Sequence, residues 1–69
     1  MDTKLIPSNV VEALGRSGAQ EFDELFKHVQ KYQSGINETE FNKILMEMEV
    51  QGLIRVTRMA KGKRRIELS

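Results

Sequence analysis

Cations gather near the carboxyl end of this chain of 69 residues, where their chemistry suits the binding of phosphate. Residues 53–69 carry six cations against one anion, a net charge of +5, whereas the preceding 52 residues have a net charge of −4. The six are Arg55, Arg58, Lys61, Lys63, Arg64 and Arg65. A basic segment attached to an acidic body predicts a protein that binds a polyanion, and nucleic acid is the polyanion we expect.

Catalytic and metal-binding sites have no support in the composition. The chain lacks cysteine, which excludes disulfides, thiol catalysis and cysteine-ligated metals. Its only histidine, His28, has no companion at a metal-ligand spacing. The acidic residues Glu21, Asp23 and Glu24 are explained by the positive end of a helix dipole. We therefore expect a non-enzymatic protein without a cofactor or small-molecule ligand.

Hydrophobic periodicity predicts three helices, over residues 9–16, 21–32 and 38–51. The middle helix has the clearest pattern, because its apolar residues recur at spacings of three and four. The expected core residues of the three helices are Val10, Ala13, Leu14, Phe22, Leu25, Phe26, Val29, Tyr32, Phe41, Ile44, Leu45 and Met48.

Polar residues and glycines mark the expected ends of these helices. Asn9 and Asn37 each precede a glutamate by three residues, which is the spacing of a capping box. Gly15 or Gly18 would end the first helix, and a very short strand could follow this turn. Gly35 is expected in a left-handed conformation after the second helix, and Gly52 is expected to stop the third.

The C-terminal segment predicts a β-hairpin whose register follows from its residues. Burying Ile54 and Val56 together with Ile66 and Leu68 requires that Val56 pair with Ile66 and Ile54 with Leu68. This register leaves residues 60–62 as the loop, with Gly62 in a left-handed conformation. It also sets Arg55 opposite Glu67, which is favourable, and Arg58 opposite Arg64, which is not.

The length and composition indicate one α+β domain over residues 1–69. No signal peptide or membrane-spanning stretch is recognisable, so the expected location is the cytoplasm, or the nucleoid if the protein binds DNA. A core this small would gain from dimerisation, although no residue specifies a homodimer.

Residues 41–56 (FNKILMEMEVQGLIRV) resemble the third helix and first wing strand of the winged helix-turn-helix superfamily, in its small prokaryotic DNA-binding type. The resemblance extends over residues 8–68 and implies three helices followed by a hairpin wing. It also implies that the third helix enters the major groove of double-stranded DNA through Thr39, Asn42, Lys43 and Met46. The implied wing contacts are Arg58, Lys61, Lys63, Arg64 and Arg65.

The third predicted helix is acidic, which leaves several functions open. Its four glutamates outnumber Lys43, and they would be repelled by the phosphates of a duplex. The wing could therefore supply most of the affinity for DNA, in a transcriptional regulator or a chromosome-associated factor. Alternatively, the exposed Met46 and Val50 could dock a protein of a transcription or replication assembly, or could pack on Leu5 and Ile6. Duplex RNA is a further alternative partner.

Overall fold

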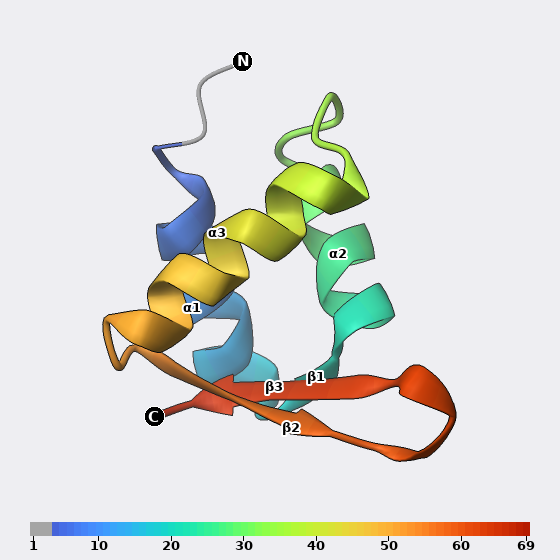
Figure 1. Ribbon diagram of the computed structural model, residues 1–69. Coiled ribbons are helices and arrows are strands. Elements are labelled where there is room, and N and C mark those ends of the chain that lie inside the picture. Colours follow the sequence, from blue (N-terminus) through green and yellow to red (C-terminus); the bar gives the residue numbers. More distant parts are fainter. Residues whose placement is uncertain (1–3) are drawn as a thin grey trace.

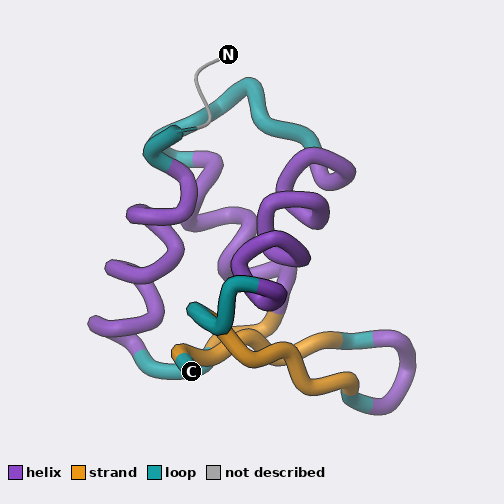
Figure 2. The backbone as a smooth tube through the Cα atoms, turned by 60° about the vertical axis from the view of Figure 1, so that its left-hand side comes forward, coloured by secondary structure: helices purple, strands orange, loops and turns teal. Residues whose placement is uncertain are grey.

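The computed structural model describes residues 4–69 as a small α+β domain with three helices and a three-stranded antiparallel sheet (Figure 1). The elements follow the chain as α1 (Ile6–Ser17), β1 (Gln20–Glu21), α2 (Phe22–Gln30), α3 (Glu38–Val50), β2 (Ile54–Arg58), a 3-10 turn (Ala60–Gly62) and β3 (Arg64–Leu68). The helices pack together on one side of the sheet, and the end of the β2–β3 hairpin extends beyond them (Figures 1 and 2). The two-residue β1 bears out the very short strand expected after the first helix.

Helix α1 begins earlier than residue 9, and the predicted cap at Asn9 is wrong. The backbone N–H of Asn9 donates to the carbonyl of Leu5 at 2.9 Å, so Asn9 lies inside the first turn of the helix. Pro7 fits this turn because a first-turn residue needs no N–H. Ile6 and Val10 are both completely buried. The helix begins earlier than predicted because this start buries the apolar side chain of Ile6.

Helix α3 begins and ends as the sequence predicts. The side chain of Asn37 accepts a hydrogen bond from the backbone N–H of Glu40 at 2.8 Å. At the other end Gly52 has a φ of 79°, and the N–H of Leu53 donates to the carbonyl of Met48 at 3.0 Å. This is the hydrogen-bonded stop that glycine provides after a helix.

Helix α2 is shorter than predicted, and two expectations around it are wrong. Tyr32 was expected in the core, but the helix ends at Gln30 and the Tyr32 side chain is 59% exposed. Gly35 does not have a positive φ, whereas Gly18, which ends α1, does. The chain instead turns back through Ile36, whose buried side chain replaces Tyr32 in the core.

The sheet has the order β1-β3-β2, and the predicted hairpin register is confirmed at every pair. Val56 lies opposite Ile66, Arg55 opposite Glu67 and Arg58 opposite Arg64. Strand β1 adds a pairing of Gln20 with Ile66 that local sequence patterns could not reveal. The expected burial of Leu68 is wrong, because Leu68 is the last residue of β3 and is 39% exposed there.

The core joins all three helices to the base of the hairpin. Phe22, Phe26 and Phe41 form an aromatic cluster with ring centroids 5.3 to 6.2 Å apart, within the range of favourable ring contacts. Ile54 and Ile66 are the buried residues of the sheet, while Phe26, Ile44 and Val56 are partly buried around the core. The buried apolar residues of the described chain are Ile6, Val10, Ala13, Leu14, Phe22, Leu25, Val29, Ile36, Phe41, Leu45, Met48, Ile54 and Ile66.

Candidate nucleic-acid interface

The loop of the hairpin is a tight turn that exposes Lys61. The backbone N–H of Met59 donates to the carbonyl of Lys63 at 2.7 Å and closes the turn. Gly62 has a φ of 74°, which confirms the predicted left-handed glycine. Lys61 also has a positive φ, of 63°, and no local pattern had indicated this. A lysine in this conformation is uncommon, and here it carries an exposed ammonium group at the end of the hairpin.

The confirmed register divides the hairpin cations between the two faces of the sheet. Side chains alternate along each strand, so Arg58 and Arg64 lie on the face of Val56 and Ile66, toward the helices. Arg65 lies on the opposite face, beside Thr57 on the neighbouring strand. The cations expected to act together on DNA therefore do not form a single flat patch.

Arg64 differs from the other hairpin cations because it is half-buried and contacts two helices. Its guanidinium carbon lies 4.1 Å from the centroid of the Phe22 ring, a favourable cation–π distance. Its Nη1 group donates a hydrogen bond to Oδ1 of Asn42 on α3. Phe22 was expected only as a core residue, and a contact across 42 positions leaves no local signal in the sequence.

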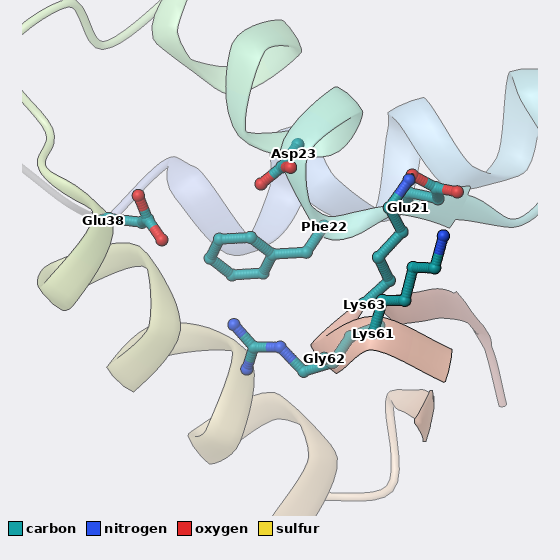
Figure 3. Close-up of a pocket in the computed structure, with 8 residues that line it drawn as sticks. Glu21, Phe22, Asp23, Glu38, Lys61, Gly62 and Lys63 are labelled. Atoms are coloured by element: carbon teal, nitrogen blue, oxygen red, sulfur yellow. The ribbon is translucent and has the colours of Figure 1, made fainter. Parts of the chain in front are cut away.

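A cleft of about 270 Å³ separates the hairpin end from the start of α2 and of α3 (Figure 3). Figure 3 shows the side chains of Lys61 and Lys63 extending on the same side of this cleft as Glu21, while the carboxylates of Asp23 and Glu38 lie on the other side of the Phe22 ring. Nζ of Lys63 lies 4.0 Å from the Glu21 carboxylate, because β1 brings Glu21 beside β3. The remaining lining residues are Phe22, Gly62 and Arg64.

Three of the predicted DNA-binding cations of the hairpin are exposed and form no ion pair within residues 4–69. They are Arg58, Lys61 and Arg65. Arg55, in contrast, lies 3.9 Å from the Glu67 carboxylate, the cross-strand pair that the register predicts. Exposed pairs such as Arg55–Glu67 and Lys63–Glu21 contribute only about 0–1 kcal/mol, so they hold their cations weakly.

The predicted groove residues of α3 have different environments. Thr39 and Lys43 are exposed, whereas Asn42 is half-buried and points toward the hairpin through its bond to Arg64. A groove of about 200 Å³ runs between α3 and the hairpin. Its lining residues are Asn42, Leu45, Met46, Glu49, Val56, Arg58, Arg64 and Ile66.

Met46 and Val50 form an exposed apolar pair on α3, and these residues are 57% and 88% exposed. The alternative in which they pack against the N-terminal segment is wrong. Ile6 points into the core, and Leu5 is itself 60% exposed. The pair lies in a shallow, mainly apolar surface depression, whose other lining residues are Lys43, Glu47 and Gln51.

Residues 4–69 show neither a cluster of metal-ligating side chains nor a membrane-spanning helix. No group of three or more potential metal-ligating side chains comes together there. None of the helices in this part of the chain has the length and apolar character needed to cross a membrane. The partly exposed His28 lies beside Tyr32, with ring centroids 5.6 Å apart.

Comparison of the chain with protein-family models, with curated proteins and with solved structures finds no match.

Proposed function

We propose that this chain is a winged helix-turn-helix domain that binds double-stranded DNA, with the β2–β3 hairpin as its wing. The order of the elements supports this fold, since three helices precede a hairpin that extends from the helical body. The proposed role is that of a transcriptional regulator or chromosome-associated factor in the cytoplasm. The hairpin is called the wing from here on.

The exposure of Arg58, Lys61 and Arg65 is the observation that carries the proposal. These cations lie at or beside the end of the wing, and no carboxylate of residues 4–69 lies within 4.0 Å of them. A phosphate that approaches them would displace water and counterions rather than an internal partner. Lys63 is a fourth candidate, because its exposed pair with Glu21 is weak enough to be exchanged for a phosphate.

Helix α3 contributes less to the proposed binding than the wing does. Thr39 and Lys43 are exposed in its first half, near the positive end of the helix dipole. Glu38 and Glu40 lie in the same first turn and oppose a polyanion. The affinity should therefore come mainly from contacts of the wing with phosphates, which carry no sequence information.

The test is a fluorescence-anisotropy titration of a duplex of about 20–30 base pairs, or two to three helical turns, at several salt concentrations. The native chain is compared with a variant in which Arg58, Lys61 and Arg65 are changed to Ala. Three neutralised phosphates would give a slope of log affinity against log salt near about −2.7, from about −0.9 for each. We expect the variant to lose this salt-dependent binding.

The matched control removes the same charge from the helical body, by changing Arg16, Lys27 and Lys31 to Ala. These three residues are exposed, and we expect the control to keep the salt dependence of the native chain. Absence of binding by the native chain at low salt would refute the proposal. An equal loss of affinity in both variants would attribute the binding to net charge rather than to the wing.

A second candidate function is the docking of a partner protein on Met46 and Val50. The exposure of this pair favours it, because two neighbouring apolar side chains on a helix surface can anchor an interface. Met46→Asp and Val50→Asp should then abolish assembly and leave the unfolding transition unchanged. Unfolding of both variants would show instead that these residues support the fold.

A further inference from the structure

Arg64 is held by the interior of the domain more firmly than any other cation of the wing. It is the only half-buried member of the six, and its guanidinium stacks over the Phe22 ring at 4.1 Å. It also donates to Oδ1 of Asn42, so it joins the wing to the start of α2 and to α3. A planar guanidinium can stack and donate at the same time, whereas an ammonium group cannot reproduce this geometry.

The contact with Arg64 also occupies the side chain of α3 that is best suited to reading a base. An asparagine amide recognises adenine by accepting one hydrogen bond and donating another. In Asn42, Oδ1 already accepts a hydrogen bond from Nη1 of Arg64. The Nδ2 group of Asn42 donates to the Met46 sulfur at 3.8 Å. For Asn42 to recognise a base, its hydrogen bond to Arg64 in the wing would therefore have to break.

The exposed surface around Asn42 offers no replacement for this amide. Lys43 is flanked by Glu40 three residues before it and by Glu47 four residues after it, spacings at which helical side chains are neighbours. Further along the same surface, Met46 and Val50 cannot form hydrogen bonds to base edges in the way an amide or guanidinium does. Among the proposed groove residues, only Thr39 remains with a neutral polar group and no side-chain hydrogen bond within residues 4–69.

We infer that Arg64 positions the wing rather than contacting DNA, and that its bond to Asn42 makes the chain bind duplex DNA without regard to sequence. This inference rests on the proposed function. The ligand is then any B-form duplex, held through its phosphates by Arg58, Lys61 and Arg65. Asn42 acts inside the protein, as the acceptor that holds the wing against α3.

The first part of the test needs no DNA. Urea unfolding is measured for Arg64→Ala, Asn42→Ala and the double variant. We expect the double variant to lower the unfolding midpoint by less than the sum of the two single shifts, because both substitutions remove the same contact. Additive shifts would overturn the positioning role. If Arg64→Ala does not fold, Arg64→Lys replaces it in the cycle, since it keeps the charge and loses the stacked, forked geometry.

The second part uses two duplexes of equal length and base composition but scrambled sequence. The native chain should bind both with affinities within about threefold, and Asn42→Ala should leave their ratio unchanged. A base contact would discriminate by about 1–3 kcal/mol, which corresponds to about 5- to 150-fold. A preference in that range that Asn42→Ala removes would overturn the inference.

The third part compares Arg64 with Arg58, its partner across the two strands and therefore a matched control. Arg58→Ala should reduce the magnitude of the salt slope by about 0.9, the value for one phosphate contact. Arg64→Ala should weaken binding severalfold and leave the slope unchanged, and an equal reduction of the slope would refute its positioning role. If the native chain binds no DNA, both the proposed function and the sequence-independent binding are refuted. The urea unfolding of the Arg64 and Asn42 variants still tests whether Arg64 positions the wing.

Discussion

The helical body and the end of the wing are built on opposite principles. The body holds eleven of the thirteen buried apolar residues of the described chain, and the other two, Ile54 and Ile66, lie at the base of the wing. Between Thr57 and Arg65 no described side chain is fully buried, and four cations in that stretch are exposed. The body is stabilised by apolar burial, whereas the wing end is a short turn closed by backbone hydrogen bonds.

Stability and the proposed function therefore depend on separate parts of the molecule. Substitutions at the exposed cations should leave the core intact, and substitutions in the core should act on folding alone. Arg64 is the exception, because it lies in the wing and contacts Phe22 and Asn42 of the body. Three pairs of matched substitutions test this division.

The largest effect is expected from Phe41→Ala. Phe41 is completely buried and contacts both other phenylalanine rings, so its truncation should cost about 3–5 kcal/mol. A domain of this size has a total stability of only about 3–10 kcal/mol, from about 0.05–0.15 kcal/mol per residue. Urea unfolding followed by circular dichroism should therefore show a chain that is largely unfolded or close to it.

Lys61→Ala is the control for this experiment, because it truncates an exposed side chain at the end of the wing. Its free energy of unfolding should stay within about 0.5 kcal/mol of the native value. Comparable losses in the two variants would contradict the division between body and wing.

An intermediate effect is expected from alanine substitutions at two glycines. Gly62→Ala in the wing places a side chain at a φ of 74°, and the added Cβ meets no atom within 4 Å. Its cost is therefore that of the backbone conformation alone, about 1–2 kcal/mol. Gly15→Ala inside α1 should instead stabilise the domain by about 0.5–1 kcal/mol, since alanine favours the helix. Thermal unfolding should give shifts of opposite sign, and shifts of the same sign would refute this prediction.

The smallest difference in stability is expected between alanine substitutions at two asparagines near helix starts in the body. Asn37→Ala removes the hydrogen bond to the N–H of Glu40 and should cost about 1 kcal/mol. Asn9→Ala should be neutral or raise stability by a few tenths of a kcal/mol, because Asn9 lies within the helix and alanine has the higher propensity. Equal losses at the two positions in urea unfolding would mean that Asn9 caps its helix after all.

Local patterns predicted a large part of this structure. The third helix, its Asn37 cap and its Gly52 stop depend on residues a few positions apart, and each is confirmed. The register of the wing followed from the requirement that Ile54 and Val56 share one face with Ile66 and Leu68. These features could be predicted because short-range hydrogen bonds and side-chain alternation determine them.

The errors occurred where distant packing outweighed a local signal. Asn9 had the spacing of a cap, but burial of Ile6 against the rest of the core began α1 earlier. Tyr32 continued the apolar pattern of α2, but the chain left the helix at Gln30 and buried Ile36 instead. Hydrophobic periodicity cannot tell which of two nearby apolar residues the remaining elements will cover.

The basic character of the C-terminal segment, the acidic character of α3 and the side-chain alternation of the wing follow from the order of the residues alone. Only the tertiary structure decided which cations are free, because β1 brings Glu21 beside Lys63 and the packing of α2 and α3 brings Phe22 and Asn42 to Arg64. The physical reason is that charge belongs to each residue, whereas the partner of a charge depends on contacts between residues far apart along the chain.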